Sequence, residues 1–199
     1  MNVFFKKFLN KLKKRKQIEE SEKTKIRRRI RNKKNILSDM EKAQSSIAVF
    51  DKIEALPAFI NAKSVLMYWS LPDELPTHNF IVKWSNKKQM LLPMVKGDRM
   101  LVKPFTSMDD LRKSDMGIWE PDVQKEYLRH IDLVIVPGIA FDKHKNRLGR
   151  GKGYYDRYFN HKNIVKVGVC YDFQLLEVVP TEPFDVSMDK VITPNYTIS

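Results

Sequence analysis

The feature that most limits what this chain can fold into is a series of short apolar runs separated by polar or helix-forming stretches. The run DLVIVPGIAF (132–141) is the most apolar, and its Val, Ile and Leu residues follow one another without a polar alternation. Such runs are typical of strands buried on both faces of a sheet. The other runs that we predict to be strands are SVLMYW (64–69), QMLLPMV (89–95), RMLVKPF (99–105), IVKVGVC (164–170) and a short one in DKVITPN (189–195).

Helix-forming stretches lie before and between these runs. We expect helices over 77–86 and 154–160, and a longer helix that begins at Ser38, because Ser38 and Glu41 have the spacing of a capping box. That helix should stop near Pro57. Its expected buried positions are Ile47, Phe50, Ile53 and Leu56. Strands that alternate with helices predict an α/β layered fold with a largely parallel central sheet flanked by helices.

The strong positive charge belongs to the beginning of the chain. Residues 1–34 contain 15 Lys and Arg against 3 Glu, which accounts for +12 of the net +13 and leaves +1 for the remainder. Residues 1–16 have a basic amphipathic pattern, with apolar positions Phe4, Phe5, Phe8, Leu9 and Leu12. Residues 17–36 predict a highly charged helix with a thin stripe of Ile18, Ile26 and Ile30. We therefore divide the chain into an extension (1–20) and a single domain (21–199).

Composition excludes several classes of protein. No apolar run approaches the ~18 residues that span a bilayer, and lysines interrupt the beginning too early for a signal peptide. Cys170 is the only cysteine, which excludes an intramolecular disulfide or a cysteine-based zinc cluster. We expect a cytoplasmic globular protein, a monomer or homodimer. The histidines show no ligand spacing and are expected at the surface: His78, His130, His144 and His161.

The stretch NRLGRGKGYYDRYF (146–159) is the strongest candidate for a site. Gly149, Gly151 and Gly153 alternate with Arg150 and Lys152. Glycine permits a positive φ and close approach of a ligand, and successive amides in such a loop can converge on an anion. The spacing matches neither a Walker A loop nor the dinucleotide fingerprint. A loop between a strand and a helix, rich in cations, is nevertheless where we expect a nucleotide phosphate, with a flexible solvated turn as the alternative.

The segment FDKHKNRLGRGKGYYDRYF resembles the signature of the 5-formyltetrahydrofolate cyclo-ligases, also called 5,10-methenyltetrahydrofolate synthetases. Four further segments resemble the same family in the same order: EKTKIRRRIRNKKNILS, YWSLPDELPT, GIWEP (117–121) and VVPTEPFDVSMDKVIT. Residues 1–20 lie outside the resemblance. It implies a NagB/RpiA/CoA-transferase-like fold and the ATP- and Mg²⁺-dependent cyclisation of 5-formyltetrahydrofolate to 5,10-methenyltetrahydrofolate. ADP and phosphate are released, through an N5-iminium phosphate intermediate.

The resemblance also assigns site residues. On the ATP side it implies Lys23, Arg27, Arg147, Leu148, Gly149, Arg150, Gly151, Lys152, Gly153, Tyr154 and Tyr155, with Lys152, Arg150 and Tyr155 as catalytic residues. Arg150 and Lys152 would supply fixed positive charge to the transferring phosphoryl group. Without the resemblance, Lys23 and Arg27 would be part of a solvated charged face.

Folate and metal positions follow in the same way. The implied folate-binding residues are Trp69, Glu74, Trp119 and Tyr154, and the implied Mg²⁺ ligands are Asp156 and Asp185. A carboxylate can accept a pair of donors from the pterin ring. The alternatives are that Trp69 is strand core, that Glu74 is a loop charge and that Asp156 caps a helix. The family often has His before its C-terminal aspartate, whereas this chain has Phe184, which leaves Asp189 as a possible substitute ligand.

Two other function classes are open. The basic beginning and the aromatic-basic loop would suit a nucleic-acid-binding protein, but a body of charge +1 argues against it, and we expect no nucleic acid partner. RNA binding that weakens steeply with salt would support that class. A folate-binding protein without catalysis would retain Glu74 and lose the glycine loop or the carboxylates, both of which this chain keeps. Residues 1–16 would also suit weak contact with a membrane surface; the alternatives are a disordered, solvated extension and a helix packed on a neighbouring subunit.

Overall fold

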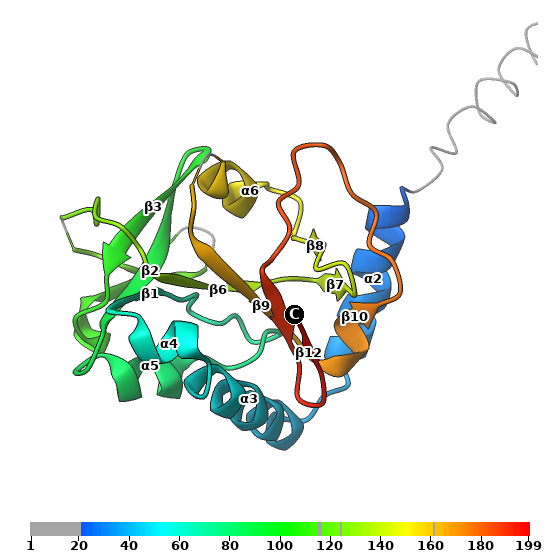
Figure 1. The fold of residues 1–199 in the computed structure, drawn as a ribbon, viewed down its shortest axis with the longest axis horizontal. Helices are drawn as coiled ribbons and strands as arrows, with labels where there is room; N and C mark the ends of the chain where they lie inside the picture. Colours follow the sequence, from blue (N-terminus) through cyan, green and yellow to red (C-terminus); the bar gives the residue numbers. More distant parts are fainter. Residues whose placement is uncertain (1–20, 115–116, 124, 161) are drawn as a thin grey trace, which may run out of the picture.

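The computed structural model describes residues 21–114, 117–123, 125–160 and 162–199 (Figure 1). The proposed extension over 1–20, Ile18 and His161 lie outside these ranges. Seven strands form the central sheet in the order β12–β11–β9–β6–β1–β2–β3. Their bounds are β1 (Ser64–Leu66), β2 (Gln89–Lys96), β3 (Arg99–Pro104), β6 (Leu133–Pro137), β9 (Val165–Val169), β11 (Lys190–Ile192) and β12 (Thr197–Ile198). The five inner strands, β11, β9, β6, β1 and β2, are each parallel to their inner neighbours, and only β3 and β12 at the two edges pair antiparallel. The prediction of a largely parallel sheet is therefore confirmed.

Both faces of this sheet are covered. Helices α3 (Asp39–Glu54), α4 (Pro57–Asn61) and α5 (His78–Trp84) lie together on one side, and α6 (Tyr154–Phe159) lies on the other (Figure 1). Neighbouring residues of β6 accordingly point into different clusters, Ile135 towards the side of α3 and Val134 towards the side of α6. Burial on both faces is the reason for the uninterrupted apolar sequence of β6.

Two expected strands are shorter in the structure. The expected strand 132–141 is two strands, because β6 ends at Pro137 and β7 (Ala140–Asp142) belongs to a small sheet with β8 (Arg147–Leu148) and β10 (Leu175–Leu176). The expected strand 64–69 ends at Leu66. Beyond it, the side chain of Thr77 accepts from the Ser70 amide at 3.1 Å and donates to the Tyr68 carbonyl at 2.7 Å, in place of a neighbouring strand. The remaining elements are β4 (Leu111–Lys113), β5 (Trp119–Pro121), η1 (Met108–Asp110) and η2 (Asp172–Gln174).

The capping box that begins α3 is confirmed, since Ser38 and Glu41 bond each other's backbone amides. Phe50 and Ile53 are buried as expected, but Ile47 is 63% exposed and this prediction is wrong. Val49 is buried instead. The core-facing side of the helix passes through Ser46, whose hydroxyl donates to the Pro76 carbonyl, and this rotates Ile47 towards solvent.

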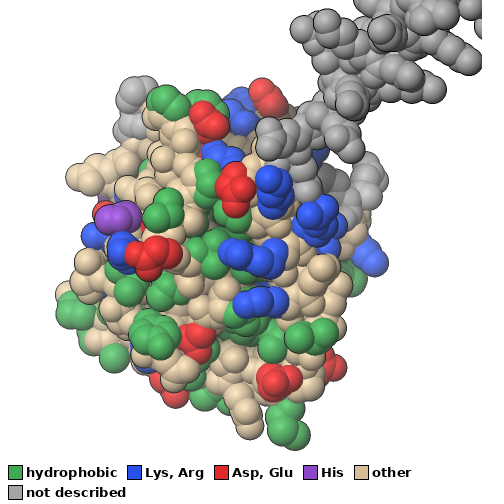
Figure 2. Space-filling view, turned by 90° about the vertical axis from the view of Figure 1, so that its right-hand side faces the viewer, with side chains coloured by type: hydrophobic (Ala, Val, Ile, Leu, Met, Phe, Trp, Pro, Cys, Tyr) green, Lys and Arg blue, Asp and Glu red, His purple; other side chains and the backbone are tan. Residues whose placement is uncertain are grey.

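The first described helix, α2 (Glu22–Lys34), packs one face on the domain and leaves the other in water. Ile26 and Ile30 are buried in a cluster with Leu148. Lys and Arg side chains gather on the molecular face that carries α2 (Figure 2); its exposed basic residues are Lys25, Arg28, Arg29, Arg31 and Lys33. None of the helices within the described ranges is long and apolar enough to cross a membrane.

Candidate functional site

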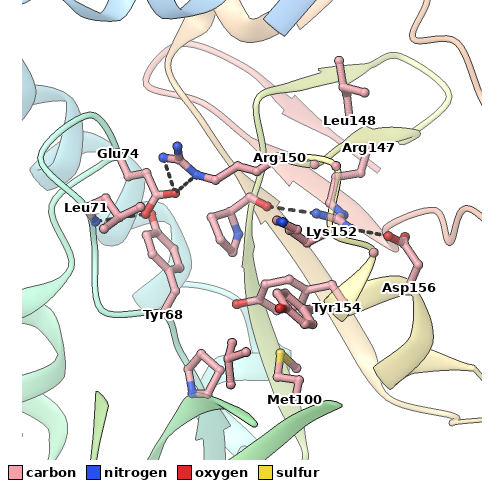
Figure 3. A pocket seen from close by; sticks show the side chains of 18 of the residues that line it. Tyr68, Leu71, Glu74, Met100, Arg147, Leu148, Arg150, Lys152, Tyr154 and Asp156 are labelled. Atoms are coloured by element: carbon pink, nitrogen blue, oxygen red, sulfur yellow. Dashed lines mark hydrogen bonds and ion pairs between the residues drawn. The ribbon is translucent and has the colours of Figure 1, made fainter. Parts of the chain in front are cut away.

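A cavity of about 550 Å³ opens where the segments that follow β1 and β6 leave the sheet. These are carboxyl ends of parallel strands, the usual position of ligands in α/β sheets. The loop between β8 and α6 forms one wall, and β2, β3 and β5 contribute an apolar wall that includes Val95 and Met100 (Figure 3). All sixteen residues that the sequence assigned to ATP, folate or metal line this one cavity: Lys23, Arg27, Trp69, Glu74, Trp119, Arg147, Leu148, Gly149, Arg150, Gly151, Lys152, Gly153, Tyr154, Tyr155, Asp156 and Asp185.

The glycine loop has the backbone that its sequence predicted. Gly151 and Gly153 have φ values of +100° and +65°, which residues with a Cβ rarely adopt. Arg27 of α2 donates from Nε to the Gly149 carbonyl at 3.0 Å, so the first helix is tied to the loop. Lys152 is exposed and forms no hydrogen bond or ion pair with any part of the chain that the structure describes. The loop therefore presents an uncommitted cation to the cavity.

Arg147 is a buried cation in the wall of the cavity. Its side chain is 5% exposed, and Nη2 donates to Asp156 Oδ2 at 2.8 Å. Its guanidinium lies over the ring of Tyr155, 5.4 Å from the centroid. The Nε atom has no hydrogen-bond partner among the described residues. A buried donor without a partner is costly, and at a cavity wall it suits an anionic ligand.

The two predicted metal ligands lie at the same end of the cavity. Asp156 accepts from Arg147 and, at 3.2 Å, from the Val186 amide, which fastens the C-terminal segment to α6. Asp185 accepts from Lys23 Nζ at 2.7 Å and from the Glu182 amide at 2.8 Å. Partial burial opposes ionisation of Asp185, but the hydrogen bonds from Lys23 and the Glu182 amide, together with the charges of Lys23 and Arg147, outweigh it and lower the pKa of that carboxyl.

Asp189, the possible substitute for Asp185, does not line the cavity. Its carboxylate accepts from the backbone amide of Lys166 at 2.7 Å and pairs with the Lys166 ammonium at 3.0 Å, and so connects the beginnings of β9 and β11. Within the described ranges, no three Asp, Glu, His or Cys side chains are grouped as a metal site.

The predicted folate side is an aromatic and apolar region. Trp69 is 7% exposed and stacks on His78 and on Phe105, with centroids 4.1 and 5.8 Å away. It is therefore a fixed wall, whereas Trp119 is 47% exposed at the edge. The expectation that His78 is a surface residue is wrong, because it is half-buried and burial lowers its pKa; His130 and His144 are exposed.

Glu74 and Arg150 meet across the cavity. Oε2 of Glu74 accepts from the Leu71 amide at 3.0 Å, and Oε1 accepts from Arg150 Nη2 at 3.0 Å and Nε at 3.2 Å (Figure 3). The sequence assigned Glu74 to folate and Arg150 to ATP. In the structure these two residues form an ion pair, so the two expected subsites adjoin.

Tyr154 and Tyr155, the first two residues of α6, make different contacts. Tyr154 donates its hydroxyl to the Gly97 carbonyl at 3.3 Å, which joins α6 to the turn between β2 and β3. Tyr155 packs with Phe159, and desolvation raises the pKa of its hydroxyl. Leu148 is buried, and its carbonyl accepts from the Ile139 amide.

The sequence did not single out two acidic residues of the cavity, Glu120 and Glu182. Glu120, within GIWEP, is 8% exposed and accepts from the Val95 amide at 3.1 Å. Burial raises the pKa of this carboxyl despite that hydrogen bond. Its only signal in the sequence was a charged residue between Trp119 and Pro121 in a short strand, which is too common to identify a site.

Comparisons with known proteins agree with this geometry. The sequence model of the 5-formyltetrahydrofolate cyclo-ligase family matches residues 19–194. The chain is 29% identical to the 5-formyltetrahydrofolate cyclo-ligase of Haemophilus influenzae, over 84% of this chain and 95% of that one. It is 31% identical to the probable 5-formyltetrahydrofolate cyclo-ligase of Caenorhabditis elegans, over 81% of this chain and 87% of that one.

Solved structures with a similar fold carry the family's other name. The 5,10-methenyltetrahydrofolate synthetase of Aquifex aeolicus superposes with a TM-score of 0.80 and 31% identity, over 88% of this chain and 91% of that one. The synthetase of Mycoplasma pneumoniae gives a TM-score of 0.67 and 25% identity, over 88% and 100%. The family match covers most of the domain, including every residue that lines the cavity. The chain belongs to the 5-formyltetrahydrofolate cyclo-ligase family.

Proposed function

We propose that this protein closes the ring of 5-formyltetrahydrofolate to give 5,10-methenyltetrahydrofolate, with ATP converted to ADP and phosphate. The observation that carries the proposal is the juxtaposition in one cavity of a cationic glycine loop and a carboxylate beside an aromatic wall. Cations suit the phosphates of a nucleotide, and Glu74 suits the paired donors of a pterin. The family to which the chain belongs supports the same reaction.

On the nucleotide side, four cations besides Arg150 would contact the phosphates. Lys23 and Arg27 reach the cavity from α2, while Arg147 and Lys152 come from the strand and loop that precede α6. Arg147 is held by Asp156 and Tyr155 before any ligand arrives, and its Nε is uncommitted. A cation fixed in advance stabilises developing charge without reorganising during the reaction.

The carboxylates fit Mg²⁺ bound together with a nucleotide. Mg²⁺ commonly takes one or two protein carboxylates and completes its shell with phosphate oxygens and water. Asp156 and Asp185 offer two such groups at one end of the cavity, and no third acidic ligand joins them in the described ranges. When bound, the ion would neutralise charge on the phosphates. Lys23 would then exchange its contact with Asp185 for one with the nucleotide.

In the first chemical step, the formyl oxygen of the folate attacks the γ-phosphorus. An O–P bond forms, the bond to the ADP oxygen breaks, and an N5-iminium phosphate results. An amide oxygen is a weak nucleophile, so positioning must supply much of the rate. Arg150 and Lys152 would screen the charge of the transferring phosphoryl group. Tyr155, anchored against Arg147, would orient the formyl group.

In the second step, N10 attacks the activated formyl carbon. The new C–N bond closes the five-membered ring, the C–O bond breaks with release of phosphate, and the departing phosphate takes up the proton of N10. Glu74 would hold the pterin ring while Trp69 and Trp119 border it. Since Trp69 is fixed by His78 and Phe105, the ring would meet a preformed surface.

The direct test is to mix the protein with 5-formyltetrahydrofolate, ATP and Mg²⁺ and to follow the absorbance band of the methenyl product. We expect the band to grow in proportion to protein, and ADP to accumulate in a one-to-one ratio with it. Omission of ATP, or chelation of Mg²⁺, should stop the reaction. ADP formation without the methenyl band would contradict the proposal, as would a complete absence of turnover.

A further inference from the structure

Lys34 is a buried lysine at a core-facing position of α2. It follows Ile26 and Ile30 at a spacing of four residues, so all three lie on the same face of the helix. Lys34 is 2% exposed, and its Nζ lies 3.5 Å from Asp73 Oδ2. Burial lowers the pKa of Lys34, and Asp73 and Glu74 offset part of this effect. Apolar residues often replace buried ion pairs without loss of stability, so the charge at this position calls for another explanation.

Lys34 is the first of four charged side chains in a row, Lys34, Asp73, Arg150 and Glu74, and the last two line the cavity. Asp73 faces Lys34 with Oδ2, and its Oδ1 accepts from Arg150 Nη2 at 2.6 Å. The same guanidinium bonds Glu74 at 3.0 and 3.2 Å, the end of the row that Figure 3 draws. The signs alternate, and two cations balance two carboxylates. Without Lys34, Arg150 alone would face both Asp73 and Glu74.

The balance matters because, in the proposed reaction, Arg150 has to exchange its carboxylate contacts for phosphoryl oxygens. When two carboxylates have a guanidinium as their only cationic partner, both attract it in full, and moving it to another ligand costs more free energy. The cost is smaller when a second cation pairs with one of the carboxylates. We infer that Lys34 is a positioning residue, which pairs with Asp73 and so leaves Arg150 free to move to the phosphoryl group. This inference rests on the proposed function, because it assigns Arg150 to the nucleotide.

The test compares Lys34→Met with Lys33→Met. Lys33 is the neighbouring exposed residue, whose ammonium lies 5.8 Å from the Phe173 ring, so its variant controls for the loss of one positive charge from α2. We expect Lys34→Met to fold with a lowered Tm, because the substitution removes one partner of a buried pair and leaves Asp73. Its Kd for ATP, measured by calorimetry without folate, should rise about tenfold, the size of a typical coupling between groups. The kcat/KM for ATP should fall by a similar factor, and Lys33→Met should change neither.

The double variant Lys34→Met/Asp73→Asn separates charge balance from simple structural support. It leaves one cation, Arg150, with one carboxylate, Glu74, so ATP affinity should recover to within about threefold of the unsubstituted protein. Wild-type ATP affinity in Lys34→Met would overturn the inference, as would a double variant that folds and binds ATP no better than Lys34→Met. A different result would contradict the proposed function: the unsubstituted protein would bind ATP but form no methenyl product. In that case the measurements of ATP affinity would still decide the role of Lys34.

Discussion

At the scale of single residues, the three glycines of the loop do different things. Gly151 and Gly153 have a positive φ that the turn requires. Gly149 instead provides space, because a Cβ at that position would lie 2.8 Å from Arg147 Nη1. The first glycine thus allows the buried guanidinium to lie against its own loop. The pattern G-x-G-x-G therefore combines two turn residues with one packing residue, and all three serve the placement of cations.

Lys152 gives the most direct prediction at this scale. Lys152→Ala should reduce kcat by roughly 10²–10³-fold, because it removes a preorganised charge from the transferring phosphoryl group. Stability should hardly change, since the side chain is exposed and forms no contact that folding needs. Turnover and thermal unfolding would be measured together, with the exposed Lys63→Ala as the matched control. Near-normal turnover would remove Lys152 from the catalytic set.

The acidic residues give a second prediction. Asp156→Asn and Asp185→Asn should each raise the Mg²⁺ concentration needed for half-maximal activity, because an amide replaces an anionic oxygen ligand. Asp189→Asn is the control, since that carboxylate is bonded to Lys166 away from the cavity. Activity would be titrated with Mg²⁺ well below each Tm, because Asp156→Asn also weakens the buried pair with Arg147. If only Asp189→Asn changed the Mg²⁺ requirement, the assignment of the C-terminal segment would be wrong.

The sequence could predict the members of the cavity but not how they pair. The loop was identifiable because its glycines and cations are adjacent in sequence, and the rest followed from the family resemblance. The ion pair between Glu74 and Arg150 joins residues 76 positions apart. The role of Lys34 was hidden in a run of basic residues, since only the packing of α2 shows that Lys34, unlike Lys33, faces inwards.

At the scale of secondary structure, apolar runs located the strands well and their ends poorly. An apolar run in the sequence continues wherever the side chains stay buried, whether or not the backbone stays hydrogen-bonded to a neighbouring strand. Residues 139–141 are buried like β6 before them, yet the chain leaves the central sheet after Pro137. Gly138 lies where the chain leaves the sheet, and a larger residue would not fit there, because a Cβ would lie 2.6 Å from the Phe141 ring.

The same ring makes β9 sensitive to substitution. A Cβ at Gly168 would lie 2.4 Å from Phe141 Cε1, and Phe141 is fully buried. Gly168→Ala should therefore destabilise the fold by about 1–3 kcal/mol, the usual cost of overpacking a core. Chemical denaturation would measure the loss against Val165→Ala, which changes a 41% exposed position in the same strand. A Gly168→Ala variant as stable as the unsubstituted protein would show that the ring of Phe141 can move aside.

At the scale of the whole molecule, the uneven charge has two separate meanings. Part of the basic beginning belongs to the site, because Lys23 and Arg27 extend from α2 into the cavity. The other exposed cations of α2 lie on the outer face (Figure 2). Net charge alone could not distinguish the cations that line the cavity from those on the outer face of α2, because it does not show which way a side chain points. The layered fold was easier to predict, because it depends on the order of elements rather than on the direction of single side chains.

Residues 1–16 lie outside the described part of the chain, and their sequence carries the last prediction. The apolar positions Phe4, Phe5, Phe8, Leu9 and Leu12 would share one side of a helix, with lysines around them. Lysines near anionic lipid contribute about 1 kcal/mol each, so the full-length protein should co-sediment with anionic vesicles, less so as salt is added. A variant without residues 1–16 should stay in the supernatant.

Ring closure should survive the same deletion, because Lys23 is the first of the described residues to line the cavity and α2 begins at Glu22, capped by Ser21. The deletion removes no residue of the described domain. The methenyl absorbance assay on both proteins therefore separates two roles for the segment. Full-length protein that remains soluble beside anionic vesicles at low salt would end the membrane hypothesis, whereas a deletion that abolishes turnover would make these residues part of the active domain.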